Sequence, residues 1–117
     1  MKGEINMGNT TKSVPWSFTI EFDEEKAKRN GYDIETLYDY VGRNIEHLGI
    51  ERIARGSWKV KDIRDKVTAQ CTALCGLARK SWVMENIKSW TVYEGDPGNG
   101  HDYLQVIREV SPELMCV

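Results

Sequence analysis

The sequence lacks the features that mark several large classes of protein. No run of about 18 apolar residues occurs, which excludes a transmembrane helix. The first residues include no apolar segment of the kind found in secretory signals, so we expect a cytoplasmic location. Neither sign of charge dominates, because 16 Lys and Arg residues stand against 18 Asp and Glu residues, for a net charge of −2. This balance excludes a strongly basic nucleic-acid binder and a strongly acidic mimic of nucleic acid.

Cysteine is scarce, and its number is odd. Cys71, Cys75 and Cys116 form the full set, so a complete intramolecular disulfide framework is impossible. Cys71 and Cys75 stand four residues apart in a predicted helix, where we expect both to be small buried apolar residues. A zinc site would need two further ligands, and neither His47 nor His101 lies at a familiar spacing. We therefore predict no metal and no cofactor.

The motifs of common catalytic sites are also absent. The chain has no nucleophile elbow, metalloprotease motif, P-loop or dinucleotide-binding fingerprint. His47 falls in the last turn of a predicted helix, where its charge would complement the helix dipole. The glycine-rich segment 95–102 includes Asp96, His101 and Asp102, which could serve as an acid/base or metal site but fit a solvated turn better. The sequence therefore predicts a protein that is not an enzyme.

What the chain does have is the composition of an ordinary folded domain. Its 117 residues are 40% hydrophobic and 29% charged, enough for one core and too few for two. Residues 1–15 are polar and rich in glycine, asparagine and threonine, which predicts a flexible N-terminal tail. We place a single domain at residues 16–111 and a short C-terminal tail at residues 112–117.

Hydrophobic periodicity divides this domain into strands and helices. Alternation of apolar and polar residues predicts strands over residues 16–22, 50–61, 87–94 and 103–110. Helical spacing and capping residues predict a short charged helix over residues 23–30 and long helices over residues 33–48 and 62–83. The stretch 67–78 has no charged residue, so we expect the second long helix to be buried on more than one side.

The order strand, helix, strand, helix, strand, strand predicts an α+β fold. We expect a two-layer sandwich in which about four strands, antiparallel or mixed, carry both long helices on one face. A ferredoxin-like arrangement is one option, but it needs an extra strand or a shifted order.

Tryptophan is abundant, and basic residues surround part of it. The chain has four tryptophans, and Trp58 and Trp90 lie on predicted strands next to lysines. Residues 52–66 form a locally basic strip in a chain that is acidic overall. Trp16 and Trp82 fall on apolar stripes, which predicts that they belong to the core. The candidate partner-binding residues are Arg52, Arg55, Trp58, Lys59, Lys61, Arg64, Lys88 and Trp90.

Two functions fit this pattern. The first is a small binding module that acts through a protein partner, because exposed tryptophan and arginine are common anchors of protein interfaces. An adaptor, an inhibitor or an accessory protein of a mobile element, such as a phage-type inhibitor of host defence, has this general profile. The second is a nucleic-acid-binding protein that uses the strip 52–66, because interleaved cations and aromatic rings hold single strands.

Overall fold

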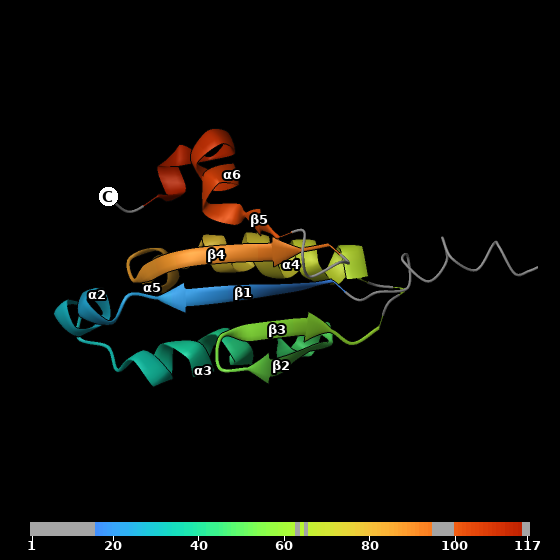
Figure 1. Cartoon of the computed structure of the whole chain (residues 1–117), viewed down its shortest axis with the longest axis horizontal. Coiled ribbons are helices and arrows are strands. Elements are labelled where there is room, and N and C mark those ends of the chain that lie inside the picture. Colours follow the sequence, from blue (N-terminus) through green and yellow to red (C-terminus); the bar gives the residue numbers. More distant parts are fainter. Residues whose placement is uncertain (1–15, 63, 65, 95–99, 116–117) are drawn as a thin grey trace, which may run out of the picture.

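The computed structural model describes residues 16–62, 64, 66–94 and 100–115. Within these residues five antiparallel strands form one sheet in the order β2-β3-β1-β4-β5 (Figure 1). The strands are β1 (Ser17–Phe22), β2 (Ile50–Ala54), β3 (Ser57–Val60), β4 (Ile87–Tyr93) and β5 (His101–Asp102). The helices are α2 (Glu24–Arg29), α3 (Ile34–Ile45), α4 (Lys66–Ala78), α5 (Ser81–Met84) and α6 (Tyr103–Val110), with 3-10 helices η1 (Glu46–Leu48) and η3 (Pro112–Leu114).

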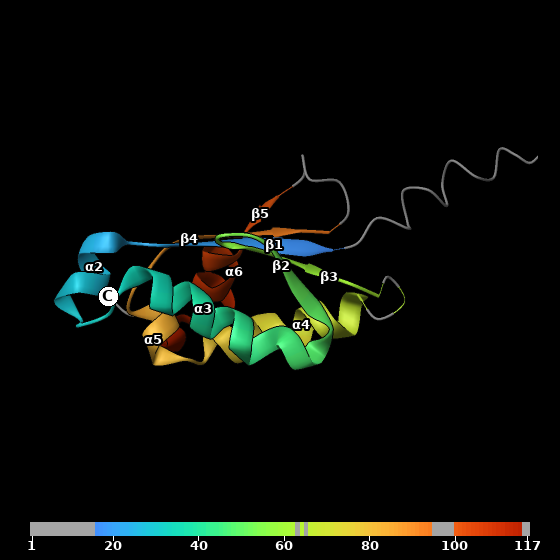
Figure 2. The same ribbon diagram turned by 90° about the horizontal axis from the view of Figure 1, so that it is seen from below.

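The layers confirm the predicted α+β sandwich. Seen along the sheet edge, α3, α4, α5 and α6 all lie on one face of the sheet (Figure 2). The units β1–α3–β2 and β3–α4–β4 interleave so that β1 lies between β3 and β4. This is the split β-α-β arrangement of ferredoxin-like folds, extended here by β5 and α6.

Strand β1 forms the centre of the sheet, as its alternating sequence predicts. Phe18 and Ile20 are buried beneath the helices, whereas Thr19 between them points to the open face. The register sets Phe18 opposite Trp58 on β3 and Ile20 opposite Trp90 on β4. The four side chains therefore share the helix-covered face and build the middle of the core.

The expected single strand over residues 50–61 is wrong, because the segment folds back on itself as β2 and β3. The turn lies at Arg55 and Gly56. A Cβ atom built on Gly56 would lie 2.4 Å from the backbone oxygen of Ile20, so only glycine lets the turn approach β1. The Gly56 carbonyl accepts a 2.8 Å hydrogen bond from the Ile20 amide. The turn supplies the extra strand that the ferredoxin-like arrangement requires.

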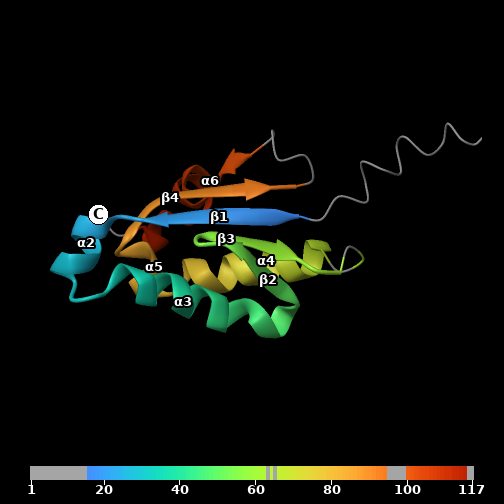
Figure 3. The same cartoon turned by 60° about the horizontal axis from the view of Figure 1, so that its bottom comes forward.

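The two helices between β1 and β2 form where their capping residues predict. Asp23 and Asp33 are the N-caps of α2 and α3; the Asp23 side chain accepts hydrogen bonds from two amides of the first turn, and the Asp33 side chain accepts from one. Gly49 adopts a left-handed conformation with a φ of 78° and ends the helical segment after η1. Figure 3 shows α3 running along the side of the helical layer that faces β2 and β3.

The expected helix over residues 62–83 is divided into α4 and α5, separated by Arg79 and Lys80. Helix α4 packs one face against the sheet. The buried residues of that face are Ala69, Gln70, Ala73, Leu74, Leu77 and Ala78. The side-chain amide nitrogen of Gln70 donates hydrogen bonds to the backbone carbonyls of Ser17 (3.1 Å) and Tyr93 (3.3 Å). These two bonds connect α4 to the ends of β1 and β4.

The predicted strand over residues 103–110 is also wrong, because these residues form α6. Asp102 is its N-cap and accepts from the amides of Leu104 (3.1 Å) and Gln105 (3.3 Å). Capping two amides of the first turn favours the helix over a strand. Leu114 and Met115, placed by the sequence in a C-terminal tail, pack against the core. The expected flexible tail, residues 1–15, lies outside the described residues.

Candidate functional site

The structure buries both tryptophans that we expected to contact a partner. Trp58 has 0% and Trp90 has 1% of its surface exposed. Trp58 stacks on Phe18 with ring centroids 5.6 Å apart, and Trp90 meets the edge of Tyr103 at 4.8 Å. Neither indole has a face available for a nucleotide base or a partner protein. Both are core residues, because their strand register places them under the helices.

The other two tryptophans were assigned to the core, and the structure buries them only in part. Trp82 is partly buried and meets the edge of Tyr40 with ring centroids 5.7 Å apart. Trp16 is also partly buried and lies beneath the ammonium group of Lys66, 5.7 Å from its ring centroid.

The cationic candidates are paired with carboxylates. Five of the six form ion pairs with acidic residues on neighbouring segments or on the adjacent turn. The pairs are Arg52–Asp39 (2.9 Å), Arg55–Glu35, Lys59–Glu51 (3.7 Å), Arg64–Asp62 (3.1 Å) and Lys88–Glu21 (3.7 Å). Exposed pairs of this kind add little stability, but each carboxylate cancels the field that a phosphate group would meet.

The arginines of the β2–β3 hairpin also have structural contacts. The Arg52 guanidinium donates to the backbone carbonyl of Arg55 at 2.6 Å and closes the turn from outside. The Arg55 guanidinium lies 4.6 Å from the ring centroid of Tyr38, and the hydrogen bond from Arg55 to Glu35 raises the pKa of Arg55 above its usual value. Both side chains hold the hairpin against α3.

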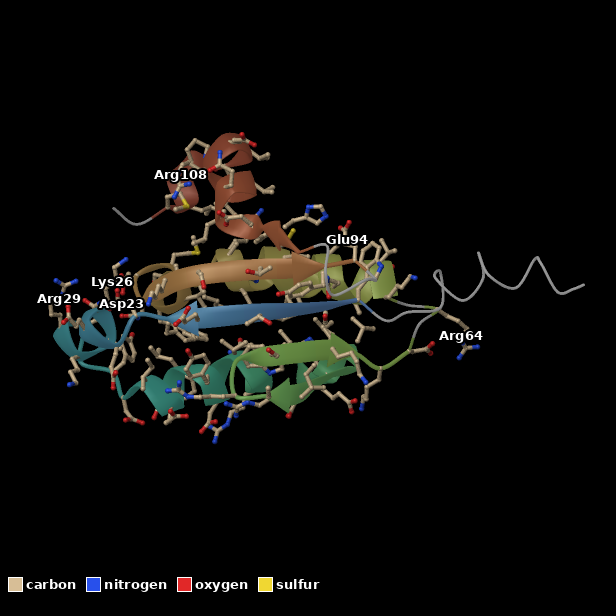
Figure 4. The ribbon with its side chains drawn as sticks, viewed as in Figure 1. Asp23, Lys26, Arg29, Arg64, Glu94 and Arg108 are labelled. Carbon is tan, nitrogen blue, oxygen red and sulfur yellow. The ribbon has the colours of Figure 1, made fainter. Side chains whose placement is uncertain are left out.

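The basic residues do not converge on one patch. Arg64 lies at the end of the molecule opposite to Lys26 and Arg29, and Arg108 projects from α6 (Figure 4). Lys61 lines a cavity of about 410 Å³ between α3 and β2. The charged lining of this cavity combines three acids with three bases: Asp39, Glu46, Glu51, Arg43, Arg52 and Lys61. Opposite charges balance there, so the cavity offers no strong preference for an ion of either sign.

The loop candidates separate into different roles. Asp102 is the cap of α6, which accounts for its position without a catalytic function. His101 is exposed on the short strand β5 and lines a groove between α4 and α6. Asp96 lies outside the described residues. Among the residues that the structure describes, no group of three or more His, Cys, Asp or Glu side chains could hold a metal ion.

Sequence reasoning missed a surface on the outer side of α4. The residues on this side are Val67, Thr68, Cys71, Thr72, Cys75 and Gly76, and all are exposed. Val67 keeps 52% of its surface accessible, and the two cysteines that we expected to be buried are exposed. Helix α4 packs against the sheet and against α3, whereas this outer side is open, so burial does not extend around the whole helix.

Helix α6 adds exposed apolar residues beside this side of α4, with Glu94, His101 and Arg79 at the grooves between them. Val106 and Val110 are 41% and 74% exposed. A groove of about 360 Å³ runs between Cys71 and Cys75 on α4 and Val106 on α6, and an adjoining groove of about 150 Å³ reaches Val110. We call the outer side of α4 together with Val106 and Val110 the α4–α6 surface. The signal for it in the sequence is the uncharged stretch 67–78.

Comparison of the sequence with protein-family models and with curated proteins gave no match. Within the described part of the chain, no helix is both long and apolar enough to cross a membrane. The function must therefore be argued from the surface itself.

Proposed function

We propose that this protein is a small binding module that engages a protein partner through the α4–α6 surface. The observation that carries the proposal is the exposed, uncharged side of α4, which continues onto two exposed valines of α6. Contiguous exposed apolar patches mark interaction sites in folded proteins.

The chemistry of this surface favours a protein over a nucleic acid. The cores of protein interfaces are depleted in charged residues, because stripping water from an ion costs more than packing returns. Nucleic acid instead requires cations directed at phosphates. The outer side of α4 has no cation between Val67 and Gly76, and the candidate cations of strip 52–66 lie largely in ion pairs.

The test introduces a negative charge into the α4–α6 surface and, as a control, the same charge at an equally exposed position outside it. Val67→Asp and Val106→Asp each alter the α4–α6 surface. Ile53→Asp on β2 is the control, because Ile53 is 53% exposed and Val67 is 52% exposed. We expect a partner captured with the wild-type protein and with Ile53→Asp to be lost with both valine variants. The purified partner must then bind the wild-type protein directly.

Two results would contradict the proposal. One is a direct partner that binds Val67→Asp and Val106→Asp as tightly as the wild-type protein, provided that circular dichroism shows all variants folded. The other is tight binding of nucleic acid whose affinity falls steeply as salt rises, because such binding depends on phosphate contacts.

A further inference from the structure

Two thiols lie one helical turn apart on the outer side of α4. Cys71 and Cys75 are both exposed, and both line the groove between α4 and α6. Side chains four residues apart on a helix have Cβ atoms about 5–6 Å from one another. They lean in the same direction along the helix, which is poor geometry for a disulfide between them. The pair therefore has the spacing to hold one small ligand between two sulfur atoms.

The walls of the groove favour a soft ligand. Leu74, Val92, Tyr103 and Val106 supply apolar surface beside the thiols, and Glu94 and His101 line the same groove. Partial burial, and then the charges that Cys75 and Cys71 carry when ionised, raise the pKa of the Tyr103 phenol. Tyr103 lines the same groove as both cysteines.

The ligand count selects among metal ions. Structural zinc sites need four ligands, and calcium and magnesium need several oxygen atoms. In the described residues no third metal-binding side chain joins Cys71 and Cys75 in a cluster. Soft thiolate ligands select copper(I), zinc and iron–sulfur clusters, and structural zinc sites and iron–sulfur clusters usually take four protein ligands. We propose that Cys71 and Cys75 form a two-thiolate site for a soft monovalent metal ion, of which copper(I) is the representative.

The binding reaction balances in protons, bonds and charge. Each thiol releases one proton, two copper–sulfur bonds form, and the complex of one cuprous ion with two thiolates carries a charge of −1. No oxidant or reductant takes part, because copper enters and stays as copper(I). Tyr103 lines the same groove, and in this proposal its hydroxyl is a positioning group rather than a ligand.

The experiment is an anaerobic titration of the reduced full chain with copper(I) in competition with a chromophoric chelator. We expect one tight copper(I) per chain. Cys71→Ser and Cys75→Ser should each weaken binding at least about 100-fold, since each removes one of two ligands. Thr72→Ser, on the same exposed side of α4, is the control and should leave the affinity unchanged. Tyr103→Phe retains the ring that packs on Trp90 and should cost up to about tenfold, the size of an outer-shell effect.

Several results would overturn this assignment. Binding by the double variant Cys71→Ser/Cys75→Ser as tight as that of the wild-type protein would show that other groups hold the metal. A loss with His101→Ala as large as the loss with Cys75→Ser would show a site with three ligands. Zinc(II) that binds more tightly than copper(I) would exclude a two-thiolate site. These outcomes are independent of the proposed partner, because Val67→Asp keeps both thiols.

Discussion

Replacement of glycine by alanine should have opposite effects at two positions of this fold. Gly56 lies in the β2–β3 turn, where a Cβ atom would approach the Ile20 oxygen to 2.4 Å and the Tyr38 ring to 3.0 Å. Gly76 lies in α4, where a Cβ atom would meet nothing within 4 Å. The same chemical change therefore overpacks one site and leaves the other open.

The magnitudes follow from these contacts. At Gly56 the turn must move away from β1, which costs about 1–3 kcal/mol in overpacking. The 2.8 Å hydrogen bond from the Ile20 amide to the Gly56 carbonyl weakens as well, for a further cost of about 0.5–1.5 kcal/mol. At Gly76 alanine gains up to about 1 kcal/mol, because glycine is the poorer helix former. We expect the two variants to differ by about 1.5–5.5 kcal/mol.

Urea unfolding followed by tryptophan fluorescence measures this difference, because the buried indoles of Trp58 and Trp90 report the loss of the core. Gly56→Ala should lower the unfolding midpoint and Gly76→Ala should raise it slightly. If Gly56→Ala unfolds within about 0.5 kcal/mol of the wild-type protein, the close approach of the turn to β1 is refuted. If Gly76→Ala destabilises as much as Gly56→Ala, the open surroundings assigned to Gly76 are refuted.

Three further predictions concern buried hydrogen bonds and pH. Tyr38→Phe should cost about 1–3 kcal/mol, because the buried Phe22 amide loses its acceptor, the Tyr38 hydroxyl at 3.0 Å; thermal unfolding measures this. Asn86→Ala, which removes a side chain with 0% exposure, should cost a similar amount, whereas Asn44→Ala at the surface should change the stability little. The hydrogen bond from the Lys26 amide lowers the pKa of the Asp23 carboxyl from 3.8. The stability that ionised Asp23 contributes to the fold is therefore fully present above that value and is lost as pH falls through the folded pKa. Asp23→Asn keeps a capping acceptor but does not ionise, so its stability should change less with pH in acid unfolding curves over this range.

The elements that could be predicted from the sequence are those whose signals are local. Strand β1 follows from the alternation that ends at Phe22, because residues two apart share one face of a strand. Helices α2 and α3 follow from Asp23 and Asp33, whose carboxylates satisfy amides within the first turn. These signals need no information about distant parts of the chain.

The β2–β3 hairpin could not be separated from a single strand by alternation. Ile50 pairs with Val60 and Arg52 pairs with Trp58 across the hairpin. The members of each pair are separated by an even number of residues, so they share one face whether the segment is straight or folded back. Only the close approach of Gly56 to β1 distinguishes the two structures, and that contact is 36 residues distant in sequence.

Helix α6 shows a different ambiguity. The apolar residues Tyr103, Leu104, Val106, Ile107 and Val110 fit a short strand or a helix about equally well. The Asp102 cap favours the helix, and the burial of Ile107 fixes which side faces the core. In the sequence, Asp102 belongs equally well to the glycine-rich loop before it, so its capping role appears only with the structure.

The burial of Trp58 and Trp90 could not be predicted from composition, because composition reports the cost of exposing a residue to water and not what covers it. An uncharged helix and a tryptophan on a strand both predict burial in the core or contact with a partner. In this chain the tryptophans are buried, whereas one side of the uncharged helix is exposed. Trp58 and Trp90 are covered by this chain's own helices, whereas Val67 on α4 remains 52% exposed. A helix that met only water on its outer side would gain from charged residues there, since they cost nothing to solvate and improve solubility. Their absence from the outer side of α4 is therefore the physical reason to look for a partner there, rather than at the paired cations of strip 52–66.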